Sequence, residues 1–171
     1  MRETGLAHCD RVAEIRVRGR RSAYRGLMPP QAHLDAMDPA ADAERRRALF
    51  GRAPGGVVNL VAGDDGGEVV GWACHGPYRD GEARTADAEL YAICVDTGRF
   101  GEGVGQTLLR ESVRRCESAG YPRMLLWVLR GNARARRFHE RAGFRPHGAE
   151  EPFVVDGVAV PEVRYARPPA S

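Results

Sequence analysis

The chain has 171 residues, a formal net charge of +3, 43% hydrophobic residues and 29% charged residues. This length and composition are typical of one globular domain with a sizeable core, and they predict a single domain over residues 1–171. The charge is too small to indicate a nucleic-acid-binding protein, and no apolar run approaches the roughly 20 residues that a membrane span needs. The N-terminal residues lack the apolar core of a signal peptide, so we expect a cytoplasmic protein.

The first half of the chain predicts helices followed by a β-hairpin. The expected elements are helices over 11–24, 31–37 and 42–50, then strands over 57–63 and 68–76. Asp10 is the expected N-cap of the first helix, and Pro39 is expected to end the second.

The second half alternates strands and helices. After a loop over 77–86 we expect a strand over 88–95, a helix from Val104 that ends before Gly120, a strand over 123–129, a helix over 132–142 between Asn132 and Gly143, and a hairpin over 153–166 that turns at Asp156 and Gly157. The whole order predicts a mixed α/β (α+β) fold, in which a mixed central sheet carries helices on both faces and ends in a C-terminal hairpin.

The junction between strand 88–95 and the next helix is rich in glycine, with Gly101, Gly103 and Gly105 at every second position. Several backbone N–H groups meet there at the positive end of a helix dipole, which indicates an anion site. A P-loop is excluded because the chain contains no lysine, and the dinucleotide fingerprint fails because its last glycine is replaced by Gln106 or Leu108. The four cysteines are scattered without metal-ligand spacing, so we expect no bound metal.

Two motifs in this part of the chain resemble the GNAT superfamily of acyl-CoA-dependent N-acyltransferases. Gly103 and Gly105 fill the glycine positions of the superfamily's pyrophosphate motif, R/Q-x-x-G-x-G/A. The motif N-x-x-A-x-x-x-Y-x-x-x-G-F is filled further along by Asn132, Ala135, Gly143 and Phe144. The resemblance is firm over residues 86–145 and departs at two positions: Phe100 replaces the arginine or glutamine, and His139 replaces the tyrosine.

The resemblance implies a GNAT fold that binds acetyl-CoA. The pyrophosphate is expected on the loop formed by Phe100, Gly101, Glu102, Gly103, Val104, Gly105 and Gln106. The pantetheine arm is expected to bond to the backbone of Ile93, Cys94 and Val95, where a bulge splays the fourth strand from the fifth, and to Asn132 on the other side. Among the arginines of helix 132–142 we assign the 3′-phosphate contact to Arg136; the alternative is that these arginines are solvated.

Aminolysis of a thioester needs a base for the amine and help for the departing thiolate. Glu89 is the expected base: it is the one carboxylate in an apolar strand, and regular alternation would place it on one face with Tyr91, Ile93 and Val95. The histone-acetyltransferase branch of the superfamily has its base glutamate at the corresponding position. The alternative is a strand-end glutamate that is solvated or paired with an arginine.

His139 is the expected acid, because it stands at the tyrosine position of the second motif and lies on the apolar face of its helix. The alternative is a core histidine bonded to a backbone carbonyl.

The expected function is transfer of an acetyl group from acetyl-CoA to a primary amine, of a small molecule or a protein, by direct attack in a ternary complex. An alternative is a catalytically weak acyl-CoA-binding sensor or regulatory module on the same fold. The resemblance places the acceptor among residues 18–38, 77–86 and 150–160, whose acids suit a cationic amine. We expect no nucleic-acid or membrane partner, and a homodimer through the sheet or the terminal hairpin is compatible with this fold.

Overall fold

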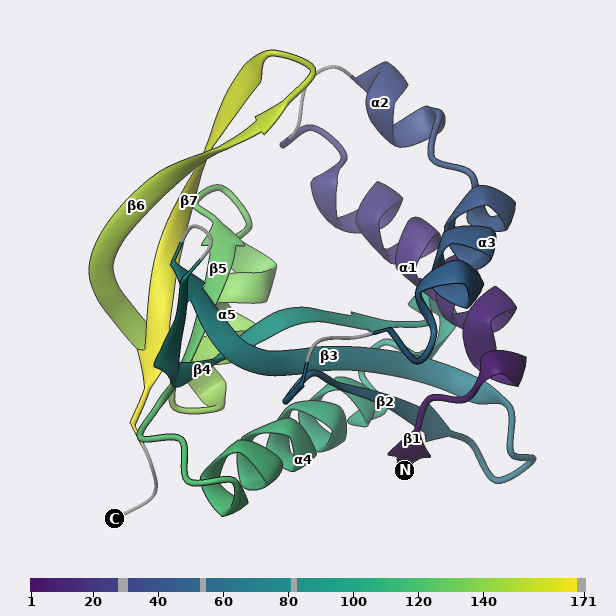
Figure 1. Cartoon of the computed structure of the whole chain (residues 1–171). Helices are drawn as coiled ribbons and strands as arrows, with labels where there is room; N and C mark the ends of the chain where they lie inside the picture. Colours follow the sequence, from purple (N-terminus) through teal and green to yellow (C-terminus); the bar gives the residue numbers. More distant parts are fainter. Residues whose placement is uncertain (28–30, 53–54, 81–82, 169–171) are drawn as a thin grey trace.

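A computed structural model describes residues 1–27, 31–52, 55–80 and 83–168. The core of the fold is a seven-stranded mixed sheet with the strand order β1-β2-β3-β4-β5-β7-β6 (Figure 1). In chain order the strands are β1 (Arg2–Glu3), β2 (Val58–Gly63), β3 (Val69–Asp80), β4 (Ala83–Val95), β5 (Met124–Leu129), β6 (Arg145–Val155) and β7 (Val158–Arg167). The helices are α1 (Cys9–Tyr24), α2 (Gln31–Asp35), α3 (Pro39–Leu49), α4 (Val104–Ser118) and α5 (Ala133–Arg141), with short 3₁₀ turns at Leu6–His8 and Thr97–Arg99. This is the predicted mixed α/β fold with helices on both faces and a C-terminal hairpin.

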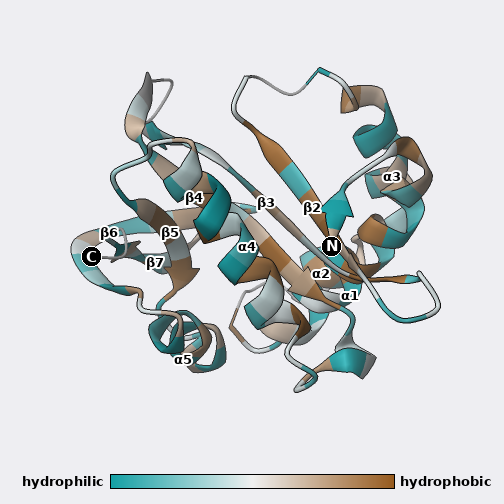
Figure 2. Cartoon of the chain, turned by 90° about the horizontal axis from the view of Figure 1, so that it is seen from below, coloured by the Kyte–Doolittle hydropathy of each residue, from teal (hydrophilic) through white to brown (hydrophobic). Residues whose placement is uncertain are grey.

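The two faces of the sheet have different helical partners, and we name them after these. On the α1 face, Val12 and Ile15 pack against apolar side chains of β2 and β3. On the α4 face, α4 packs with Leu109 and Val113, and α5 packs alongside it with Phe138. Figure 1 shows α1 and α3 on one side of β2–β4 and α4 on the other. Apolar and polar segments alternate along α4 in Figure 2, as expected for a helix with one buried side.

Strand β4 contains a β-bulge at Tyr91. Its register against β3 shifts between the pairs Cys74–Ala92 and His75–Leu90, so Tyr91 is the extra residue of β4 at this point. A single extra residue reverses the alternation of side chains along a strand. Positions after the bulge therefore lie on the opposite face from the one that regular alternation predicts.

The backbone hydrogen bonds of β4 show the same reversal. The N–H of Ala88 donates to the carbonyl of Arg123, next to β5, whereas the N–H of Asp96, an even number of residues later, donates to the carbonyl of Val70 in β3. In a regular strand, residues separated by an even number point their backbone groups the same way. Beyond the bulge, the backbone groups that regular alternation would point toward β5 therefore point toward β3, and those that it would point toward β3 point toward β5.

Strands β4 and β5 are paired only at their beginning. They run parallel, and the described register contains two pairs, Ala88–Met124 and Glu89–Leu125. The remaining length of β5 pairs with β7 on its other edge. The bulged half of β4 and the carboxyl half of β5 therefore diverge, which opens the middle of the sheet, as the resemblance implied.

Several local predictions are confirmed at the ends of elements. The Asn132 side chain caps α5 by accepting the N–H of Ala135 at 3.0 Å. Gly143 follows that helix with φ of +90°. The terminal hairpin turns at Asp156 and Gly157, both with positive φ, as a two-residue hairpin turn of type I′ requires.

Three predicted boundaries were wrong. Helix α1 begins at Cys9 with His8 as its N-cap, so Asp10 lies in its first turn instead of capping it. Pro39 starts α3 behind an N-cap at Asp38, because proline suits the first turn of a helix, where no N–H partner is needed. The expected loop over 77–86 is instead the distal part of the β3–β4 hairpin, apart from residues 81–82, which lie outside the described residues.

No helix in the described part of the chain is long and apolar enough to cross a membrane.

Candidate active site

The glycine-rich loop presents unpaired backbone N–H groups at the start of α4. Gly103 is the N-cap, with φ of +82°, and the first helical hydrogen bond runs from Thr107 N–H to the Gly103 carbonyl at 3.0 Å. No described residue accepts a hydrogen bond from the N–H groups of Val104, Gly105 or Gln106. Such groups are the usual binding site for a phosphate at a helix N-terminus.

The glycines of this loop have two different physical roles. Gly103 and Gly101 have positive φ and open space around them, so only their backbone conformation requires glycine. Gly105 has an ordinary φ, but a Cβ there would lie 3.2 Å from the Phe138 ring and 3.4 Å from Val95. Gly105 thus allows α4 to approach α5 and β4 closely, while Gly103 shapes the turn.

We expect Gly103→Val to weaken coenzyme A binding by about 1–3 kcal/mol, because a β-branched residue avoids positive φ and the turn must move its N–H groups. The reason is backbone strain and not a steric clash, because nothing lies within 4 Å of a Cβ built at Gly103. Calorimetry with coenzyme A measures the effect. Gly120→Val is the matched control: Gly120 also has positive φ and open space, but lies at the far end of α4. Equal affinity in wild type and Gly103→Val would remove the loop from the site.

Arg134 of α5 lies next to this loop. Its guanidinium lies 4.0 Å from the centroid of the half-exposed Phe100 ring. Arg136, to which we had assigned the phosphate contact, is engaged elsewhere: its Nε donates to the Tyr165 hydroxyl at 2.9 Å and its Nη1 to the Arg130 carbonyl at 3.2 Å. The contacts of Arg136 are structural, and Arg134 is the better-placed cation.

The bulge decides which backbone groups of β4 face the opening. Because Asp96 N–H points to β3, alternation points the backbone of Cys94 to β3 as well. The backbone groups of Ile93 and Val95 then point toward the splayed side. The expectation is therefore kept for Ile93 and Val95 and corrected for Cys94, whose partly buried thiol packs on the α1 face, where desolvation raises its pKa.

Glu89 is buried, and it lies on the α1 face. It is 7% exposed, and its neighbours Ala88 and Leu90 pack on the α4 face. The bulge separates it from Ile93, which packs on the α4 face, so the predicted shared face was wrong. Glu89 is paired with an arginine, as the alternative stated: it accepts the backbone N–H of Arg79 at 3.3 Å and its Nη2 at 3.4 Å.

Arg79 itself is held by Tyr91. The guanidinium of Arg79 stacks 4.0 Å from the centroid of the Tyr91 ring, and the Tyr91 hydroxyl donates to the Pro77 carbonyl. The bulged residue thus positions the cation that orients the Glu89 carboxylate.

His139 lies in the apolar contact between α5 and the sheet. It is 6% exposed, its ring packs edge-on against Phe138 and Phe144, and its Nδ1 has no hydrogen-bond partner among the described residues. Burial lowers the pKa of His139 to about 4, so the ring is neutral near pH 7. The structure does not show the backbone-carbonyl bond at Nδ1 that a structural core histidine would make.

We expect the free energy of unfolding to fall as the pH drops from about 6.5 to 4. His139 and the buried His75 have folded-state pKa values of about 4 against 6.5 in the unfolded chain, so the unfolded state binds protons first. Each histidine contributes stability above pH 6.5 that is lost on acidification, up to about 3 kcal/mol for full protonation. Urea unfolding at a series of pH values measures it. The fall should be smaller in His139→Phe. If the free energy of unfolding of this variant depended on pH as it does in wild type, the low pKa of His139 would be contradicted.

Sequence reasoning missed Glu162 on β7. It is half-buried and lies opposite Leu129 of β5 on one side and Glu151 of β6 on the other. No hydrogen bond or ion pair joins its carboxylate to a described residue, and burial together with Glu151 raises its pKa to about 6. The hairpin turn could have revealed the pair, because a two-residue turn at Asp156 and Gly157 places residues 151 and 162 opposite one another.

The described residues contain no group of histidine, cysteine, aspartate and glutamate side chains that could hold a metal ion.

The model of the acetyltransferase (GNAT) family matches residues 21–144 of the chain. The chain belongs to the GNAT family. GNAT acetyltransferases transfer an acetyl group from acetyl-CoA to an amine, and acetyl-CoA is therefore the co-substrate of this enzyme. This activity, together with the unpaired N–H groups at α4 and the splayed strands, disfavours a module that only senses acyl-CoA.

Curated relatives and solved structures are consistent with this GNAT assignment. The uncharacterized N-acetyltransferase YuaI of Bacillus subtilis is 29% identical over 171 residues, which cover 100% of this chain and 94% of the relative. The L-methionine sulfoximine/L-methionine sulfone acetyltransferase of Pseudomonas aeruginosa is 34% identical over 108 residues, 63% of this chain and 62% of that protein. The crystal structure of a ribosomal-protein-alanine N-acetyltransferase from Brucella melitensis has a TM-score of 0.75 at 24% identity and covers 98% of both chains.

Proposed function

We propose that this GNAT enzyme acetylates a primary amine by direct attack on acetyl-CoA in a ternary complex. The observation that carries the proposal is the opening between β4 and β5, which starts beyond the pair Glu89–Leu125 and is bordered by backbone groups of Ile93 and Val95 that strand alternation points away from β3. This edge runs toward the N–H groups at the start of α4. A helix N-terminus that can bind phosphate, next to a strand edge that faces an opening, suits a ligand with a pyrophosphate and an amide-rich arm.

The residues present suit coenzyme A along this path. The pyrophosphate would accept hydrogen bonds from the backbone of Gly103 to Gln106, and Arg134 beside the loop would neutralise a phosphate group. The amides of the pantetheine arm would pair with Ile93 and Val95. Asn132 uses its Oδ1 to cap α5, which leaves its amide nitrogen as the donor toward that arm.

The two proposed catalytic side chains lie on opposite faces of the sheet. Glu89 is on the α1 face, and His139 packs between α5 and the sheet on the α4 face. A thioester can be reached from both faces, and so by both side chains, only where the sheet is open. We therefore infer that the reacting carbonyl lies in the gap between β4 and β5. The amine then approaches from the α1 face, and the thiolate leaves toward α5.

The reaction begins with loss of a proton from the ammonium form of the acceptor. Glu89 accepts this proton directly or through a water molecule, while Arg79 keeps its carboxylate oriented. The nitrogen attacks the thioester carbonyl carbon, the C–S bond breaks, and the nitrogen gives up its second proton to water as the amide forms. The departing thiolate accepts a hydrogen bond from the neutral ring of His139 and takes up a proton from water. The products are an amide and coenzyme A with a free thiol.

The test is release of free thiol from acetyl-CoA with a panel of small primary amines and peptides with a free N-terminal amine. We expect thiol release that depends on the amine and yields the acetylated product by mass spectrometry. Binding of coenzyme A without thiol release from any acceptor would instead support the acyl-CoA sensor.

A further inference from the structure

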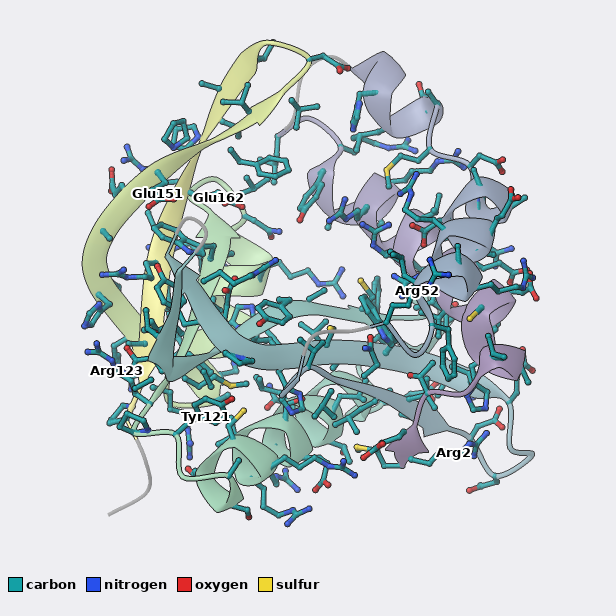
Figure 3. The ribbon with its side chains drawn as sticks, viewed as in Figure 1. Arg2, Arg52, Tyr121, Arg123, Glu151 and Glu162 are labelled. Carbon is teal, nitrogen blue, oxygen red and sulfur yellow. The ribbon has the colours of Figure 1, made fainter. Side chains whose placement is uncertain are left out.

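An unusual pair of like charges lies on the α1 face, beyond the end of the paired part of β4 and β5. Glu151 and Glu162 are direct cross-strand partners on β6 and β7, and Figure 3 shows both on this hairpin. Like charges directly opposite one another destabilise a sheet. The chain has 26 arginines, yet neither carboxylate has an ion pair with a described residue.

The position of this pair follows from the strand register. Glu162 lies opposite Leu129, which packs on the α1 face with Tyr24. Glu89 lies beside Leu125, four positions earlier along β5 and on the same face. Four strand residues correspond to about 13 Å, so the Glu151–Glu162 pair and Glu89 lie at the two ends of the opening between β4 and β5.

The charges that surround Glu162 come from three other elements. Glu151 of β6 and Glu89 of β4 add negative potential, and Arg20 of α1 opposes them. Tyr24 of α1 is also within electrostatic reach of Glu162. The balance around the half-buried carboxylate is negative, which favours binding of a cation.

We propose that Glu162, with Glu151, binds a second positive charge on the acceptor, and that the preferred acceptors are diamines. The inference rests on the proposed function, since Glu89 then receives the proton of the reacting amine while the remote ammonium group is held at Glu162. Glu162 is in this scheme a specificity-determining residue and takes no part in bond formation. It explains why two carboxylates remain without an arginine partner at the edge of the reaction site.

The test compares diamines with monoamines of the same length. Putrescine, cadaverine and hexamethylenediamine are paired with butylamine, pentylamine and hexylamine, and kcat and KM are measured for wild type and Glu162→Gln at pH 8. We expect wild type to have a KM roughly tenfold lower for each diamine than for its monoamine, as one partly buried charge pair would give. In Glu162→Gln this preference should disappear through KM, with kcat within about threefold of wild type. Glu151→Gln should reduce the preference in the same direction.

Glu150→Gln is the matched control. Glu150 is the neighbour of Glu151 on β6, but it is paired with Arg130 and lies opposite Val163. Its substitution should leave both KM values unchanged. A further readout is pH: burial and Glu151 raise the pKa of Glu162 to about 6, so the diamine preference of wild type should decrease below pH 6, and that decrease should be absent in Glu162→Gln.

Three results would overturn the inference while the proposed function stands: equal KM for diamines and monoamines in wild type, a preference that survives in Glu162→Gln, or a preference lost equally in Glu150→Gln. If no amine is acetylated, the proposed function fails instead. Calorimetry of diamine and monoamine binding to the protein–coenzyme A complex then decides the inference alone, because tighter diamine binding that depends on Glu162 supports it and equal binding overturns it.

Discussion

Glu89→Gln is expected to lower kcat/KM by roughly 10²–10⁴-fold near neutral pH, the usual contribution of a general base. Glutamine preserves the shape of the side chain and keeps an acceptor for the Arg79 N–H, but it cannot take a proton. The loss should shrink at high pH, because an amine with a pKa of about 10.4 is then increasingly deprotonated in solution. The measurement is kcat/KM against pH with one good acceptor.

Asp87→Asn provides the control for this experiment. Asp87 lies two residues before Glu89 on the same strand, and both its oxygens accept from Arg123 at 2.9 Å. Its replacement should lower stability and leave the pH–rate profile unchanged. If Glu89→Gln also keeps the wild-type profile, Glu89 is a structural partner of Arg79, and the base is Tyr91 or a chain of water molecules.

His139→Phe is expected to lower kcat by about 10²-fold, the low end for an acid catalyst, with coenzyme A affinity nearly unchanged. The ring contacts Phe138 and Phe144, so phenylalanine keeps the packing and removes only the N–H donor. His139→Tyr should retain activity, since a phenol can donate to the thiolate. The measurement is kcat for the three proteins, with coenzyme A binding by calorimetry as the control for folding.

The pH dependence distinguishes two kinds of acid at this position. An imidazolium acid would make kcat fall as the pH rises through its pKa. Because burial lowers the pKa of His139 to about 4, the wild type should instead show no alkaline loss from this group between pH 6 and 9. A phenylalanine variant within about threefold of wild type would show that the thiolate leaves without help and that His139 is packing.

The parts of the site that depend on neighbouring residues could be predicted from the sequence. The turn at Gly103, the cap at Asn132 and the hairpin turn at Asp156 and Gly157 are set by local backbone preferences, and the structure contains all three. The order of strands and helices followed in the same way from periodicity.

The parts that depend on contacts between distant elements could not be predicted. The resemblance implies a bulge in this strand, but its position at Tyr91 depends on the register between β3 and β4; this position moves Glu89 away from the face of Ile93 and turns the backbone of Cys94 toward β3. Helical spacing also could not tell that Arg136 bonds to Tyr165 of β7, which left the place beside Phe100 to Arg134.

The turn at Asp156 and Gly157 has a consequence for how this enzyme can change. Its two residues set the register that places Glu151 opposite Glu162. One inserted residue would shift β6 by one position and exchange the faces of its side chains, while the glycine loop, β4 and β5 kept their contacts. A change in the length of this exposed turn would therefore alter the choice of acceptor and leave acetyl transfer intact. The two properties can evolve independently.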